Sequence, residues 1–296
     1  MHPSDAPAIT EIPVGGADAG PYGVATGPDG ALWVTLSRAG RIARVTPEGD
    51  VTEHTLDAPG CLPLVIAPGP DGALWFTRSG DHRIGRITPA GDVRSYAVPT
   101  QGSPYGITTG PDGAMWFTMT AADRIGRVAL DGHVTEVEVP VTGGMPSMIT
   151  TGPDGALWFT LNQANAVGRA TVQGEVTIHP LPTRDAAPVG ITSDGTRLWF
   201  VEIAAGQVGR ITPGGAVEEL PLPDRDSRPH AICASADGEC WFTEWGGNRV
   251  GRVTADGAIT GYDLPTPGSE PHGLAVGPDG AVWVALESGA LARLGR

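Results

Sequence analysis

The chain has 296 residues, of which 40% are hydrophobic and 18% charged, and it contains 44 glycines and 28 prolines. This apolar content excludes a disordered low-complexity chain and predicts a folded protein with many turns. The net charge of −14 makes nucleic acids and anionic membranes poor partners, and the absence of lysine excludes Schiff-base chemistry.

The N-terminal stretch up to Ala19 is polar and has no apolar core, so we expect no signal peptide. No run of residues approaches the ~18 apolar residues that a membrane-spanning helix needs. Three cysteines, an odd and sparse number, argue against a disulfide framework. We therefore expect a cytoplasmic protein and a monomer, and the arginine-, alanine- and glycine-rich composition suggests a bacterial source.

The first predicted element is a strand over Ile9–Val14, and a repeat follows it. The segment GPDGALWVT at Gly27 recurs in exact or degraded form until GPDGAVWVA at Gly277. Its tryptophans lie 41 or 42 residues apart, at Trp33, Trp75, Trp116, Trp158, Trp199, Trp241 and Trp283. Seven units of this length, covering nearly the whole chain, indicate a repeat architecture.

Each unit contains four short segments typical of strands. In the third unit they are 105–109, 114–118, 124–128 and 134–139, and the GPDG turn separates the first two. Four antiparallel strands in about 42 residues are typical of a propeller blade. The last unit stops after its third strand, so we expect Ile9–Val14 to supply the missing fourth strand and close the ring. The prediction is an all-β, seven-bladed propeller forming a single domain over residues 1–296.

Residues shared by all units are expected to be scaffold, so function is sought where one unit differs from the others. Two sets of equivalent positions, here called columns, stand out. The first column is the residue before the proline that opens each innermost strand: Gly20, Leu62, Ser103, Met145, Ala187, Arg228 and Glu270. The second column lies four residues after each motif tryptophan: Ser37, Ser79, Thr120, Asn162, Ile203, Trp245 and Glu287.

Unusual chemistry gathers in the last two units. A symmetric hairpin around Gly277–Gly280 places Glu270 opposite Glu287 and His272 opposite Ala285. Two directly opposed carboxylates repel each other, so a positive group should lie between them. Oxygen ligands alone favour a hard cation, and we predict that Glu270 and Glu287 bind Mg²⁺.

Aromatic residues follow the same prolines. His272 is two residues from Glu270, which puts both on one face of a strand, and His230 is its equivalent one unit earlier. Both imidazoles should point toward the mouth of the central funnel. Tyr22, Tyr105 and Trp245 are expected to form an aromatic wall around them.

A neutral histidine beside a carboxylate-bound cation is a base next to a Lewis acid. This arrangement allows two reactions. One is proton abstraction alpha to a carbonyl followed by elimination, and the other is metal-assisted hydrolysis of an ester or lactone. The sequence has no GxSxG motif, phosphate loop or dinucleotide-binding fingerprint. The residues alone leave both reactions open.

The repeat, together with RPHA at Arg228, EPHG at Glu270 and the late Glu287, resembles the virginiamycin B lyase (streptogramin B lyase) family over essentially the full chain. The resemblance implies a carbon–oxygen lyase that linearises cyclic depsipeptide antibiotics by Mg²⁺-dependent elimination and so confers resistance. It implies that Glu270 and Glu287 bind the metal. His272 would be the general base that removes a threonine Cα proton, and His230 would contact the substrate.

Two other functions compete with this one. The first is a metal-dependent lactonase or esterase acting on another cyclic ester. The second is a non-catalytic propeller that serves as a binding platform. The lyase and the hydrolase differ by one water in the mass of their product.

Overall fold

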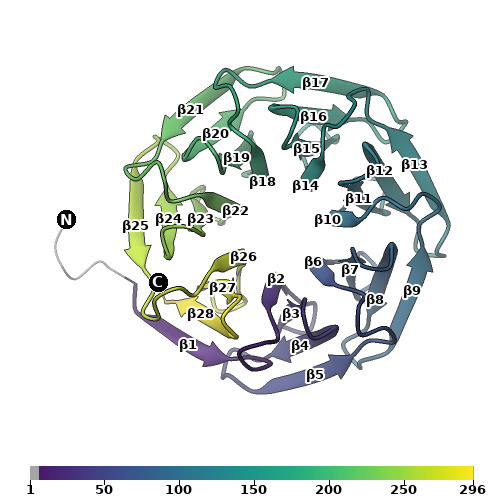
Figure 1. Ribbon diagram of the computed structural model, residues 1–296, viewed down its shortest axis with the longest axis vertical. Coiled ribbons are helices and arrows are strands. Elements are labelled where there is room, and N and C mark those ends of the chain that lie inside the picture. The colour runs from purple at the N-terminus through teal and green to yellow at the C-terminus, as the bar shows by residue number, and fades with distance from the viewer. Residues whose placement is uncertain (1–6, 296) are drawn as a thin grey trace.

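The computed structural model describes residues 7–295, which form seven four-stranded antiparallel sheets arranged around a central axis (Figure 1). The predicted seven-bladed propeller is confirmed. Residues 1–6 and 296 of the expected domain lie outside the described residues. No helix in the described part of the chain is long and apolar enough to cross a membrane.

The strands nearest the axis and those next to them form the inner half of each blade. The innermost strands are β2 (Pro21–Thr26), β6 (Pro63–Pro68), β10 (Pro104–Thr109), β14 (Pro146–Thr151), β18 (Pro188–Ser193), β22 (Pro229–Ala234) and β26 (Pro271–Val276). The second strands are β3 (Leu32–Leu36), β7 (Leu74–Arg78), β11 (Met115–Met119), β15 (Leu157–Leu161), β19 (Leu198–Glu202), β23 (Cys240–Glu244) and β27 (Val282–Leu286).

The remaining strands form the outer half. The third strands are β4 (Arg41–Val45), β8 (Arg83–Ile87), β12 (Arg124–Val128), β16 (Ala166–Ala170), β20 (Gln207–Ile211), β24 (Arg249–Val253) and β28 (Ala290–Leu294). The outermost strands are β5 (Val51–Thr55), β9 (Val93–Ala97), β13 (Val134–Glu138), β17 (Val176–Pro180), β21 (Val217–Pro221), β25 (Ile259–Asp263) and, from the N-terminus, β1 (Ile9–Pro13).

The N-terminal strand closes the ring, as the repeat arithmetic predicts. β1 pairs with β28, from Ile9 opposite Leu294 to Pro13 opposite Ala290, and completes the sheet β1-β28-β27-β26. Figure 1 shows β1 beside β28 at the point where the first and last blades meet. Closure gives the seventh blade its fourth strand and places it next to the first blade.

The repeated residues are scaffold, as expected. Asp29 of the first GPDG turn accepts hydrogen bonds from Trp33 Nε1 at 3.0 Å and from Arg44 Nε at 2.6 Å. Burial opposes ionisation of Asp29, but these two hydrogen bonds, a third from the Ala31 N–H and the charge of Arg44 together lower the pKa of the carboxyl. Equivalent Asp–Trp–Arg bonds recur in the second, third, fourth and seventh blades. The motif therefore ties the turn to the second and third strands of its own blade.

Side-chain volumes are matched across the second and third strands. In the third blade, Phe117 lies opposite Gly126, and a Cβ on that glycine would come 2.1 Å from the phenyl ring. In the first blade the smaller Val34 faces Ala43 instead. The second strands are buried along their whole length between neighbouring blades, so close packing couples the two positions.

Neighbouring blades are joined by the threonine of the second strand. Thr243 on β23 donates its hydroxyl to the carbonyl of His272 on β26 at 2.9 Å and accepts the N–H of Ala231 at 3.0 Å. Thr160 makes the same pair of bonds between the fourth and fifth blades, with Val189 and Met148. These bonds satisfy buried backbone groups and hold β26 and β18 against the blades that precede them; Val201 and Ala285 replace the threonine in the fifth and seventh blades.

Candidate active site at the funnel mouth

The two columns meet at one end of the propeller. In all seven blades the second-column residue donates its backbone N–H to the carbonyl of the first-column residue, at N···O distances of 2.9–3.2 Å. In the seventh blade this bond joins Glu287 to Glu270, so the predicted pairing of the two glutamates is confirmed. The same contact repeated seven times forms a rim around the mouth of the funnel.

The register between this rim and the turn differs from the predicted one. A β-bulge follows the opening proline of every inner strand; in β26 it lies between Pro271 and Leu274. His272 and Gly273 therefore lie within the bulge, where both are opposite Ala285, so His272 shares its predicted position with Gly273. The hairpin turn offsets the register by one residue, since Val276 pairs with Val282, and the bulge restores it at Glu270. A bulge re-aims the side chains next to it.

Glu270 also differs from the expected geometry. It lies just before β26 with a φ of 52°, in the left-handed region, so it does not continue the strand that carries His272. The rule that alternate residues share a strand face does not apply there. Glu270 is exposed, whereas His272 is buried, with 8% of its surface exposed.

His272 is held on several sides. Its Nε2 lies 2.5 Å from Oε2 of Glu287, across the hairpin. The ring stacks on Tyr22 of the first blade, with centroids 4.4 Å apart, and meets the ring of His230 edge to face at 4.8 Å. A carboxylate only accepts hydrogen bonds, so Nε2 carries the proton and Nδ1 holds the lone pair. Nδ1 is buried and has no hydrogen-bond partner among residues 7–295.

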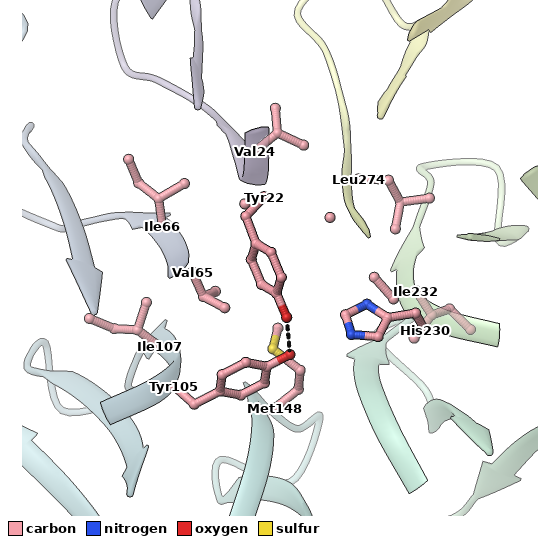
Figure 2. A pocket seen from close by; sticks show the side chains of 13 residues that line it. Tyr22, Val24, Val65, Ile66, Tyr105, Ile107, Met148, His230, Ile232 and Leu274 are labelled. Atoms are coloured by element: carbon pink, nitrogen blue, oxygen red, sulfur yellow. Dashed lines mark hydrogen bonds between the residues drawn. The ribbon is translucent and has the colours of Figure 1, made fainter. Parts of the chain in front are cut away.

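The two tyrosines lie beside the histidines, at the equivalent position of their own inner strands. The hydroxyls of Tyr22 and Tyr105 are 2.7 Å apart, and Figure 2 shows this bond facing the imidazole of His230. Apolar side chains from several blades, among them Val65 and Ile107, line the cavity of about 160 Å³ around them. Tyr22 and Tyr105, two of the three predicted wall residues, therefore lie together with His230.

Burial controls the charge of these groups. It lowers the pKa of His230 to about 3, with a further contribution from His272. Burial, assisted by the Arg38 guanidinium, lowers the pKa of His272 to about 4. Burial also raises the pKa of Tyr22 well above that of a free tyrosine. At neutral pH the two imidazoles and the phenol are therefore uncharged.

Trp245 lies apart from this group. It lines a separate pocket of about 450 Å³ with Arg225 and Arg228, and the Arg228 guanidinium lies 5.6 Å from the centre of its ring. Trp245 was expected to share one wall with the tyrosines, and it lines the pocket next to theirs. Ile203 lines both this pocket and the one that holds His230, so the two pockets are neighbours at the mouth.

Arg38 is a site residue that the column analysis missed. Its guanidinium forms an ion pair with Oε1 of Glu287, from the neighbouring first blade. Arg38 directly follows the second column, at a position occupied in the other blades by Gly80, Ala121, Gln163, Ala204, Gly246 and Ser288. Comparing the seven residues that directly follow the second column would have identified Arg38, because it is the one ionisable residue among them.

The glutamates match a magnesium site in the kind and number of their donors. The Glu270 carboxylate makes no hydrogen bond or ion pair with any residue in 7–295, and Glu287 supplies a second carboxylate at the same rim position. No cluster of three or more His, Cys, Asp or Glu in this part of the chain is arranged to hold a metal ion. Mg²⁺ is the cation that accepts one or two carboxylates and keeps several waters.

Comparisons with known proteins agree with this geometry. The sequence profile of the Virginiamycin B lyase family matches residues 7–294. A curated virginiamycin B lyase of Saccharopolyspora erythraea is 62% identical over 39 residues, so the alignment spans 13% of this chain and 13% of that relative.

Solved structures align over nearly the whole chain. A streptogramin B lyase structure is 42% identical, with a TM-score of 0.93 over 97% of each chain. A catalytically inactive virginiamycin B lyase from Staphylococcus aureus, with quinupristin, is 40% identical, with a TM-score of 0.93 over 98% of this chain and 99% of that one. With its profile match, its blades and its rim residues in agreement, this chain belongs to the virginiamycin B lyase family.

Proposed function

We propose that this protein inactivates streptogramin B antibiotics by opening their ring at the ester bond. Two findings support the proposal: membership of the family, and a relative 40% identical over nearly the whole chain whose structure contains quinupristin. The observation that carries it is the contact between His272 and Glu287 at the mouth of the funnel. A base held beside a carboxylate at the rim of the funnel suits proton abstraction from a cyclic substrate.

The reaction is an elimination. The base takes the Cα proton of the threonine residue whose side chain forms the ester. The electron pair of the broken Cα–H bond forms the Cα–Cβ double bond, and the Cβ–O bond breaks. Its electrons leave with the carboxylate. No water is consumed, so the linear product has the mass of the cyclic substrate.

Each site residue has a place in this proposal. His272 accepts the proton at Nδ1, the nitrogen left without a proton by its contact with Glu287. Glu287 and the stacked Tyr22 ring hold the imidazole in one orientation. His230, uncharged and against the same cavity, contacts the substrate.

The metal site is part of the same proposal. Glu270 and Glu287 would hold Mg²⁺, with water or substrate oxygens completing its ligands. When bound, the cation supplies a Lewis acid that stabilises negative charge developing on a carbonyl oxygen.

Mass spectrometry of quinupristin incubated with the protein tests the reaction. We expect a linear product of unchanged mass with Mg²⁺ and none after EDTA treatment. A product heavier by one water would mean that the protein is a hydrolase. A linear isomer formed equally well in EDTA would retain the lyase but overturn its dependence on a cation.

Two histidine variants test the assignment of the base. His272→Ala is expected to abolish conversion, because it removes the proton acceptor. His133→Ala is the matched control, since His133 is exposed and lies in the outer half of the third blade, before β13. Equal conversion by both variants would exclude His272 as the base.

A further inference from the structure

The rim carries a positive group whose role the proposed reaction leaves open. Glu287 has both carboxylate oxygens engaged, Oε1 by the guanidinium of Arg38 and Oε2 by Nε2 of His272. The sequence pattern calls for a positive charge beside the two opposed glutamates. In the structure Arg38 supplies that charge.

The fold makes room for Arg38 at this place. Among the seven first-column residues, six carry a side chain, and the exception is Gly20 in the blade that bears Arg38. A Cβ on Gly20 would lie 2.9 Å from Cγ of Arg38. The missing side chain therefore leaves space for the aliphatic stem of the arginine. Gly20 and Arg38 both depart from the repeat in the first blade, and together they allow the contact with Glu287.

The ion pair between Arg38 and Glu287 is exposed to solvent on the side of the arginine. The Arg38 side chain is 52% exposed, whereas that of Glu287 is 17% exposed. Ion pairs with one exposed partner contribute little to stability, because water and salt compete for the charge. The ion pair of Arg38 with Glu287 is therefore one that a competing cation can replace.

A divalent cation shared by Glu270 and Glu287 needs an oxygen of Glu287. Oε1 is the one held by Arg38, and a dication placed there is repelled by a guanidinium at the same carboxylate. We propose that Arg38 is a resident counter-cation of Glu287, and that a divalent cation binds at the rim by displacing it. This rests on the metal site of the proposed function. Arg38 thereby weakens the affinity for the cation and neutralises the charge of Glu287 in its absence.

Direct measurement of cation binding tests this without reference to turnover. Mn²⁺ is titrated into the full-length protein, and free Mn²⁺ is followed by electron paramagnetic resonance. Arg38→Gln is expected to bind Mn²⁺ about three- to tenfold more tightly than the wild type, because the competing charge is gone. Arg38→Lys keeps the charge and is expected to stay close to the wild type.

Arg228→Gln is the matched control. Arg228 is another exposed rim arginine, two blades away, and its guanidinium lies over Trp245. The Arg228→Gln substitution removes the same charge from the mouth and changes no residue that contacts either glutamate. Its Mn²⁺ affinity is expected to change less than twofold. An equal gain in Arg228→Gln and Arg38→Gln would overturn the proposal in favour of a general charge effect.

The remaining outcomes separate this inference from the proposed function. Unchanged or weaker Mn²⁺ binding by a folded Arg38→Gln variant overturns the role of Arg38 and leaves the metal site standing. No Mn²⁺ binding by the wild type, with binding by Arg38→Gln, supports the competition strongly. No binding by either protein overturns the metal site and the inference together. Circular dichroism and thermal unfolding establish that each variant is folded.

Discussion

The ring of Tyr22 lies against the imidazole of His272, with centroids 4.4 Å apart and planes inclined by 29°. The two residues are 250 positions apart in the sequence and come from the first and last blades. Closure of the ring by β1 brings these blades together. The proposed base is therefore positioned by a contact that exists only in the closed propeller.

The bond between the two tyrosines is expected to contribute to stability. Tyr22→Phe and Tyr105→Phe each remove one hydroxyl of the 2.7 Å contact and leave the other without its partner. We expect each single variant to unfold more easily, with a coupling free energy of about 1 kcal/mol in a double-mutant cycle. Urea unfolding of the wild type, the two single variants and the double variant gives this coupling free energy. Strictly additive effects would mean that the hydroxyls do not interact.

The link from Thr243 to the His272 carbonyl is expected to affect activity as well as stability. Thr243→Val leaves that carbonyl and the Ala231 N–H without their partner, at a cost of about 1–3 kcal/mol. A shifted His272 should lower kcat by about tenfold or more. Thr160→Val removes the same bonds far from His272 and should lose stability with kcat unchanged. Equal kcat values in the two variants would contradict the positioning role.

Glu202 is expected to make stability depend on pH. It is fully buried, and burial, reinforced by Glu219, raises its pKa to about 8 despite an opposing hydrogen bond from Gln207. Between its unfolded pKa of 4.5 and about 8, the folded state binds a proton that the unfolded state has lost. Stability from this group is therefore present below the lower value and lost as pH rises through this window.

Glu202→Gln removes the titration and retains a carbonyl acceptor for Gln207. Relative to the wild type, we expect the variant to gain on the order of 2 kcal/mol between about pH 5 and pH 8, measured by urea unfolding. Glu138→Gln is the control, because that side chain is 79% exposed. Parallel pH profiles for the wild type and Glu202→Gln would show that Glu202 is ionised in the folded protein.

Strain at the rim is expected to be measurable. Leu62 precedes a proline, has a φ of 48° and is 40% exposed. The left-handed conformation costs a residue with a Cβ about 1–2 kcal/mol, which glycine avoids. Leu62→Gly should therefore be up to about 1 kcal/mol more stable than Leu62→Ala, which keeps the Cβ and the strain. A higher melting temperature for the alanine variant would contradict this.

Much of the fold follows from local patterns that the sequence shows directly. Turn residues, the 41- or 42-residue spacing and the surplus N-terminal strand predict seven blades and their closure, because these depend on short-range register. The pairing of Glu270 with Glu287 was predicted for the same reason. The structure confirms this pairing. The turn and the bulge each shift the register by one residue, and the two shifts cancel.

The tertiary structure alone decided how the blades meet. Trp245 lies on the same rim as Glu287, but it lines the pocket beside Arg228, whereas Tyr22 and Tyr105 line the neighbouring one. Arg38, 249 residues from Glu287, reaches it across the junction of the first and last blades. The sequence determines each blade through contacts between neighbours in the chain. Which side chains touch across the funnel depends on the bulges and on ring closure, which set direction and distance between residues that no local pattern connects.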